Sequence, residues 1–337
     1  MNPATQSRLQ ITNNARLAWN ALNGVFVLYK PSTHFLKMRG TLIDRLCKDL
    51  NDMQVRPPTN YVSIKGDTNE KMIVDNHMNY ADHPLVVGER YQMQDIRFKA
   101  ANFLSTDVTG VFVCGINSGI PTINRIKESK PTSFYRIKGI LGQATDNYFK
   151  TGKIVEKSTY KHVKRPIIDK LCSAMQSAHQ RKMFEICGLD IQTQAAYELA
   201  CKGPIRPANP NIPMIYTIKC IEFEPPEFTL EVVCINEYDM YLKSIIHDLG
   251  MQLHTNATCT QIQCTQYGFF NVSLALLKKH WDLECILDNM RKCQQIINEN
   301  KYLLRYVSPT LVLRRPLSSK SNNTVAIYSL DRSNPGS

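Results

Sequence analysis

The chain has 337 residues, 43% of them hydrophobic, which excludes an intrinsically disordered protein and allows one large folded domain or two small ones. Its 41 Lys and Arg residues outnumber 29 Asp and Glu residues, and the net charge of +12 favours a polyanionic partner, with RNA, DNA and anionic membrane surfaces all open. No apolar run approaches the roughly 20 residues that span a bilayer, so membrane insertion is excluded.

The N-terminal region lacks acidic residues. Asp44 is the first carboxylate, whereas several Lys and Arg residues precede it. An acid-poor, basic start is typical of mitochondrial presequences, so we predict an N-terminal extension of this kind over residues 1–22. A mobile terminus without a targeting role is the alternative.

The first predicted elements are a strand and a helix. Residues 24–29 form a β-branched and aromatic run that ends at a Lys-Pro pair, which indicates a strand leaving its sheet at a turn. Residues 39–51 carry apolar side chains at helical spacing and predict an amphipathic helix. Residues 52–82 are polar and predict a long surface excursion.

The middle of the chain alternates strands and helices. Residues 111–114 and 137–141 predict buried strands, and a helix begins near Pro166, which is acceptable in a first turn. Thr193 is placed to cap a further helix, and Gly203 to end it.

Two apolar strands and a helix follow. The strands cover 215–223 and 228–235, with a Pro-Pro turn between them, and the helix covers 241–250 and ends at its glycine. Strands and helices alternate without an internal repeat, which predicts one large α+β domain over residues 23–300. Residues 301–337 contain the run LSSKSNN and predict a disordered tail.

The eleven cysteines favour free thiols in a reducing compartment. Their number is odd, and they show neither a Cys-x-x-Cys pair nor a Cys/His cluster at zinc spacing. No metal site is predicted.

Seven sequence blocks occur in an order that is informative as a set. They are NGVFVLYKPS (23–32), TGV (109–111), SFYRIKGILGQATD (133–146), YELA (197–200) with the glycine at 203, FEPPEFTLEVVC (223–234), YLKSIIHDLG (241–250) and GFF (268–270). Each alone is a weak match, but in this order they resemble the TruB family of pseudouridine synthases, most closely its mitochondrial branch.

The resemblance implies a fold and an activity. The fold is a pseudouridine-synthase-type mixed, largely antiparallel sheet with flanking helices and a central cleft. The 37 residues after Asn300 are too few for the extra C-terminal RNA-binding domain of bacterial relatives. The activity is isomerisation of a uridine in RNA to pseudouridine without metal or cofactor, on a base flipped out of its stack.

The resemblance also assigns the catalytic positions, and two of them depart from the family. An aspartate attacks the uridine, an arginine pairs with that aspartate, and a tyrosine stacks on the base. Counted from the Thr-Gly motif, the aspartate position holds Ser105, whose hydroxyl needs a base before it can act as a nucleophile. The arginine position holds Lys243, which lacks the bidentate guanidinium. Tyr135 remains as a stacking platform.

Asp107 is the alternative source of the carboxylate. It lies two residues after Ser105 and would act through a shifted turn. The Thr-Gly motif fixes the register, and a shift of two residues moves a side chain by several ångströms, which argues against this alternative.

A basic segment is the predicted RNA contact. It comprises Lys153, Lys157, Lys161, Lys164 and Arg165, interspersed with tyrosines. A solvated surface loop is the alternative. Lys30 and Thr109 complete the predicted RNA-binding set, although Lys30 is equally explained as a buried structural lysine or a turn residue.

The leading hypothesis is a mitochondrial matrix RNA-binding protein of this family with impaired catalysis. Its expected partners are mitochondrial mRNA, tRNA or rRNA, and RNA-processing or ribosome-assembly proteins. An active synthase that uses Asp107 or another carboxylate is the second hypothesis. A basic scaffold that binds only protein is the third.

Overall fold

The computed structural model describes residues 13–53, 60–66, 73–78, 83–201, 205 and 212–304. The helices are α1 (Ala15–Ala21), α2 (Phe35–Asn51), α3 (Pro84–Val87), α4 (Ile120–Glu128), α5 (Arg165–Ile186), α6 (Gln194–Cys201), α7 (Asp239–Gln252) and α8 (Leu283–Glu299). The strands are β1 (Gly24–Lys30), β2 (Asn60–Lys65), β3 (Ile73–Met78), β4 (Phe98–Ala100), β5 (Val108–Ile116), β6 (Ser133–Leu141), β7 (Gln143–Thr145), β8 (Ile154–Lys157), β9 (Met214–Glu224), β10 (Glu227–Ile235), β11 (Ala257–Tyr267) and β12 (Phe270–Asn271).

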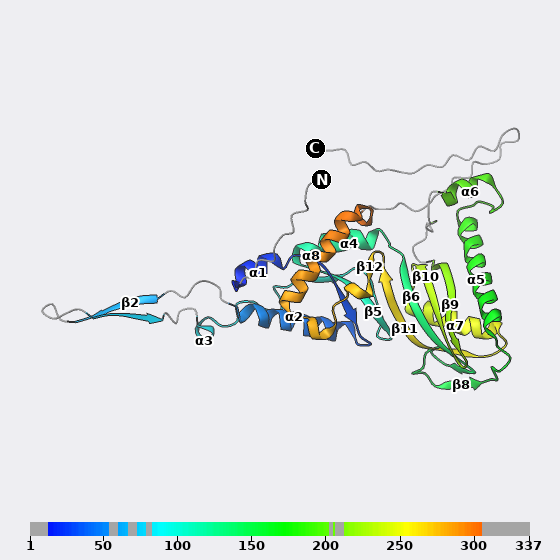
Figure 1. The fold of residues 1–337 in the computed structure, drawn as a ribbon, viewed down its shortest axis with the longest axis horizontal. Helices are drawn as coiled ribbons and strands as arrows, with labels where there is room; N and C mark the ends of the chain where they lie inside the picture. The colour runs from blue at the N-terminus through cyan, green and yellow to red at the C-terminus, as the bar shows by residue number, and fades with distance from the viewer. Residues whose placement is uncertain are drawn as a thin grey trace.

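One eight-stranded sheet organises the molecule (Figure 1). Its strands run in the order β1-β5-β11-β6-β10-β9, with β4 added beside β5 and β12 beside β11. Every pairing is antiparallel except that of β5 with β11, where Val108 lies opposite Ile262 and Gly110 opposite Cys264. The predicted α+β class with a largely antiparallel mixed sheet is therefore confirmed.

Gly110 allows the parallel pairing. Its φ of 118° lies in the region that favours glycine, and a Cβ at this position would collide with the backbone of Cys264. The Thr-Gly motif therefore fixes where β5 begins, and with it the loop of residues 101–107 that precedes the strand.

Helices pack against both ends of the sheet. Near β1 lie α1, α2, α4 and α8, and near β9 lies α5, while α7 packs on β11 (Figure 1). In α8 the buried side chains recur every three or four residues at Ile286, Met290, Cys293 and Ile297, the spacing of a helix with one apolar face.

Most predicted elements form, with wider bounds. The strand at 24–29, the helix at 39–51 and the strands around the Pro-Pro turn are confirmed as β1, α2, β9 and β10. Thr193 caps α6, since its Oγ1 accepts a hydrogen bond from the amide of Ala196 at 3.3 Å. Gly203 and residues 305–337 lie outside the described residues.

The structure corrects one expectation and adds detail to two others. Gly250 does not end α7, which continues to Gln252; a Cβ there would lie 2.6 Å from the Ala257 amide nitrogen, so this glycine lets the helix approach β11. The excursion at 52–82 contains the β2–β3 hairpin. In the predicted extension at 1–22, residues 15–21 form α1, where Ala15 and Ala18 are buried. Residues 1–12 lie outside the described part.

Candidate nucleic-acid site

A buried lysine holds the loop of residues 101–107 in place. Lys30, the last residue of β1, is fully buried, and its Nζ donates hydrogen bonds to the carbonyl oxygens of Ser105 at 2.7 Å and Val108 at 3.1 Å. Burial lowers the pKa of Lys30 to about 8, an effect that Asp107 and Asp239 partly oppose. Lys30 therefore supports the loop that carries Ser105, and its ammonium does not face solvent.

Asp107, Asp239 and Lys243 form an ion cluster, the acid–lysine cluster. The Lys243 Nζ lies 2.6 Å from Asp107 Oδ2 and 2.8 Å from Asp239 Oδ2, and its side chain is only 7% exposed. Burial acts to lower the pKa of Lys243, but the hydrogen bonds with the two carboxylates outweigh it and the pKa is raised. The Phe149 ring centroid lies 4.9 Å from the same ammonium.

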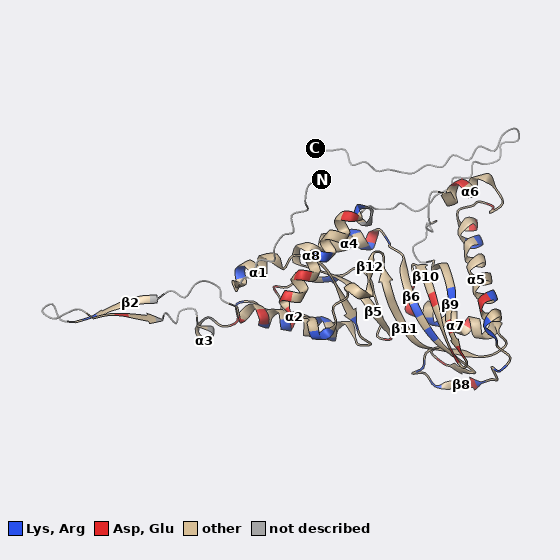
Figure 2. Ribbon diagram, in the orientation of Figure 1, with Lys and Arg blue, Asp and Glu red and all other residues tan. Residues whose placement is uncertain are grey.

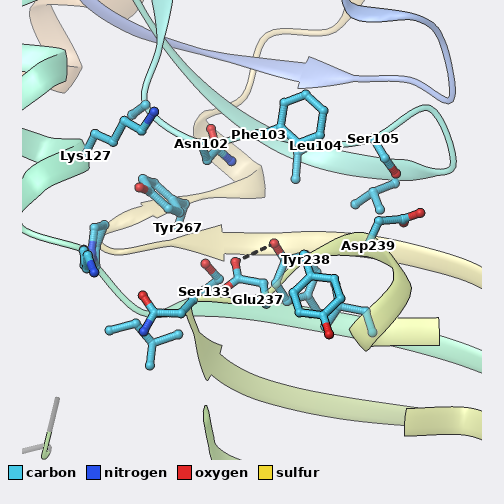
Figure 3. A pocket seen from close by; sticks show the side chains of 18 of the residues that line it. Asn102, Phe103, Leu104, Ser105, Lys127, Ser133, Glu237, Tyr238, Asp239 and Tyr267 are labelled. Carbon is cyan, nitrogen blue, oxygen red and sulfur yellow. Dashed lines mark hydrogen bonds between the residues drawn. The ribbon is translucent and has the colours of Figure 1, made fainter. Parts of the chain in front are cut away.

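A cavity of about 570 Å³ opens beside this cluster. Its wall includes Ser105, Tyr135, Glu237, Asp239 and Tyr267, drawn in part in Figure 3. Asp107 is not part of the wall. The cavity can take a planar base together with its sugar.

Tyr135 is held by a carboxylate. Its hydroxyl donates a hydrogen bond to Glu237 Oε1 at 2.8 Å, the dashed line in Figure 3. Burial, and after it the Glu237 charge, raise the pKa of Tyr135 well above its ordinary value, so the hydroxyl stays protonated. The ring is therefore fixed in the wall of the cavity.

Two oxygen atoms in the cavity wall lack hydrogen bonds. Among the described residues, neither Ser105 Oγ nor Asp239 Oδ1 has a partner, although both atoms are buried. The two side chains lie at the same end of the cavity, opposite Lys127 and Asn102 (Figure 3). Buried polar atoms without partners cost free energy and mark places where a ligand can supply the missing hydrogen bond.

The structure brings the predicted catalytic positions together. Ser105, Tyr135 and Lys243 converge on the cavity and the cluster beside it. Thr109 follows the loop and donates from Oγ1 to the Ile262 carbonyl at 3.2 Å, across the parallel pairing. The roles of these residues in RNA chemistry stay predictions.

The basic segment does not line the cavity and runs from the residue before β8 to the first residue of α5 (Figure 2). All five of its predicted side chains are exposed. Arg165 also donates to the Cys220 carbonyl at 3.2 Å. Contact of this segment with RNA stays a prediction.

Sequence reasoning missed several residues of the cavity wall. Asp239 could have been found, because it precedes Lys243 by four residues on one helix, the spacing of an ion pair. Glu237 reaches Tyr135 across 102 residues of sequence, and no local pattern indicates that contact. Phe103, Lys127, Lys130 and Tyr267 also line the cavity.

In the described part of the chain, no three His, Cys, Asp or Glu side chains gather as metal ligands. No helix among these residues has the length and apolarity to cross a membrane. The eleven cysteines are free thiols.

Comparison with known proteins gives matches over most of the chain. Residues 101–240 match the family described as "TruB family pseudouridylate synthase (N terminal domain)". The chain is 34% identical to "Pseudouridylate synthase TRUB2, mitochondrial" of Xenopus tropicalis over 284 residues, which cover 82% of this chain and 87% of that protein. The Homo sapiens protein of the same name is 34% identical over 278 residues, covering 80% of this chain and 83% of that protein. A solved structure, "Structure of H/ACA RNP bound to a substrate RNA containing 2'-deoxyuridine", aligns at 12% identity with a TM-score of 0.41, covering 87% of this chain and 61% of that chain.

Proposed function

Because the chain belongs to the TruB family of pseudouridine synthases, we propose that it binds RNA and accepts a uridine in the cavity, with the isomerase chemistry impaired. The observation that carries the proposal is Ser105, a hydroxyl at the family's aspartate position with no hydrogen-bond partner among the described residues. Tyr135 and the cavity supply the binding half of the site.

The family's reaction depends on its nucleophile. Isomerisation breaks the N1–C1′ bond of uridine and forms a C5–C1′ bond, while C5 loses its proton to solvent and N1 gains a proton. A carboxylate is ionised at neutral pH and can attack directly, whereas serine needs a base within hydrogen-bond reach. The cation at the arginine position, Lys243, is already paired with Asp107 and Asp239. It would not be available to orient a different nucleophile.

The place of action is proposed as the mitochondrial matrix. Similar proteins from Xenopus tropicalis and Homo sapiens carry "mitochondrial" in their names, and this chain has no carboxylate before Asp44. The RNA would then be a mitochondrial mRNA, tRNA or rRNA. Proteins of RNA processing or ribosome assembly would be its companions, and no cofactor is needed.

An active synthase is the second candidate, and the acid–lysine cluster favours it. Asp107 keeps a carboxylate–cation contact of 2.6 Å with Lys243, the kind of pair that the family's chemistry uses. Asp239 makes the same kind of contact and also lines the cavity. Either carboxylate could replace the missing nucleophile if RNA binding moved it toward the uridine.

The test is a single-turnover tritium-release assay on mitochondrial RNA labelled at C5 of uridine, performed after RNA binding has been confirmed. We expect no release above the protein-free control. Release that disappears in Asp107→Asn or Asp239→Asn would instead make the protein an active synthase and identify its nucleophile.

Two further measurements complete this test. A Ser105→Asp variant that gains release would show that the rest of the site is competent and that only the nucleophile is missing.

RNA affinity should fall steeply with salt concentration, because phosphate binding releases counterions. A wild-type protein that binds no RNA would contradict the proposal and favour a scaffold that binds only protein.

A further inference from the structure

Phe103 is unusually exposed for a phenylalanine. Its side chain is 84% exposed, although it belongs to the loop that carries Ser105 and lines the same cavity. Single exposed apolar residues are common on protein surfaces, but an aromatic ring at the mouth of a cavity needs a further explanation.

The backbone on both sides of Phe103 is fixed. The Asn102 side chain donates to the Val111 carbonyl at 2.9 Å and accepts from the Val113 amide at 3.0 Å. Leu104 is buried, and Lys30 holds the carbonyl of Ser105 at 2.7 Å. The ring is therefore presented to solvent on a rigid support, and little backbone entropy would be lost when a ligand contacts it.

A second exposed ring lies on the other side of the cavity. Tyr238, the residue before α7, is 56% exposed and lines the cavity. Its ring centroid lies 5.8 Å from that of Tyr241, which limits its freedom. Figure 3 shows Phe103 and Tyr238 on opposite sides of the opening. These two rings, with Lys127 and Lys130, are here named the mouth.

The cavity wall carries both lysines and carboxylates. Lys127 lies in the last turn of α4 and Lys130 follows the helix, and both line the cavity. The two carboxylates of the wall are already engaged, Glu237 with the Tyr135 hydroxyl and Asp239 with Lys243. The cavity wall therefore carries lysines as well as exposed rings, which suits a ligand that has both anionic groups and planar faces.

We propose that Phe103 and Tyr238 stack on the bases flanking the nucleotide in the cavity, and that Lys127 and Lys130 contact the adjoining phosphates. The ligand class is single-stranded or locally opened RNA. The inference rests on the proposed function, since it assumes that the cavity receives a nucleotide. An apolar peptide would use the rings but not the lysines, and its binding would not depend on salt.

The experiment measures binding of a fluorescein-labelled oligouridylate of about 12 nucleotides by anisotropy. Phe103→Ala and Tyr238→Ala should each lower the affinity about 5- to 100-fold, whereas Phe103→Trp should retain it. Leu85→Ala is the matched control, because Leu85 is 90% exposed and lies on α3, outside the cavity wall. Lys127→Glu should weaken binding and flatten its salt dependence.

The outcomes separate this inference from the proposed function. Failure of the wild-type protein to bind oligouridylate or mitochondrial RNA would remove the proposed function and the inference with it. Wild-type binding that is unchanged in Phe103→Ala and Tyr238→Ala would overturn the inference alone. Thermal unfolding of each variant should match the wild type, because both rings are exposed, and a large shift would mean that the rings act structurally.

Discussion

The acid–lysine cluster lies beside the cavity and shares Asp239 with its wall, whereas the residues of the mouth all line the cavity. In the cluster, one buried ammonium is shared by two carboxylates at 2.6 and 2.8 Å. In the mouth, Phe103 is 84% exposed and Tyr238 is 56% exposed. The charged groups of the cluster are paired with one another within the protein, whereas the two rings of the mouth are exposed to solvent.

The difference separates two kinds of group in the site. In the cluster, the charged groups of Asp107, Asp239 and Lys243 contact one another, whereas in the mouth the rings of Phe103 and Tyr238 contact solvent. The support of the loop, through Lys30 and the Thr-Gly motif, is complete. The proposed binding of a nucleotide and the proposed loss of catalysis therefore rest on different groups of the site, which can be changed one at a time.

Lys243→Ala should have the largest effect on stability. It removes the cation from Asp107 and Asp239, which are only 30% and 28% exposed, and should lower the free energy of unfolding by about 3–5 kcal/mol. Urea unfolding measures this. Lys48→Ala is the control, since Lys48 pairs with Asp44 on the surface of α2, and no measurable change is expected. Equal losses in the two variants would mean that the cluster has no special role.

Tyr135→Phe should lower the free energy of unfolding by about 2 kcal/mol, because the Glu237 carboxylate loses its hydroxyl donor. Affinity for oligouridylate should stay within about twofold of the wild type, since stacking uses the ring. Urea unfolding and anisotropy check the two parts separately. A large loss of affinity with little loss of stability would show that the hydroxyl contacts RNA.

A Lys30→Met variant tests the role of this buried lysine through the pH dependence of the free energy of unfolding. The unfolded chain keeps the lysine proton up to about pH 10.5, whereas the folded protein releases it near pH 8, so stability from this group rises with pH between these values. The free energy of unfolding of the wild type relative to Lys30→Met should therefore grow by about 1–2 kcal/mol from neutral pH to about pH 9.5. A difference that stays constant or shrinks would contradict the lowered pKa.

The smallest effects are expected in the basic segment. Lys157→Ala should lower RNA affinity about two- to threefold at physiological salt without changing stability, because the side chain is exposed on β8. Lys170→Ala, also exposed but outside the predicted segment, is the comparison. Identical affinities of the two variants would favour a solvated surface loop over an RNA contact.

The sequence predicted the parts of the fold that carry a local signal. The β-branched run of β5 and the helical spacing of α2 identify these elements directly. β11 was not predicted, because its buried positions mix polar and small side chains with apolar ones, a weak signal for a central strand; they are Ala257, Thr258, Cys259, Ile262, Cys264 and Tyr267. β11 is buried because it lies between β5 and β6 in the sheet, and its own composition does not indicate that position.

The same distinction holds for the site. Counting from the Thr-Gly motif located Ser105, since the motif fixes the register by a local backbone requirement. The contact of Lys30 with the Ser105 carbonyl spans 75 residues, and no periodicity reveals it. Phe103 was not singled out because a phenylalanine beside a buried strand is usually part of the core.

The parallel pairing of β5 with β11 has a consequence for how the protein is made. β11 lies between β5 and β6 in the sheet, and Thr109 bonds to a carbonyl 153 residues further along the chain. During synthesis, the strand leading from Ser105 and the strand bearing Tyr135 both emerge from the ribosome well before the strand that joins them. A chain stopped before Ala257 leaves these two walls with nothing between them, so the cavity is completed only late in translation.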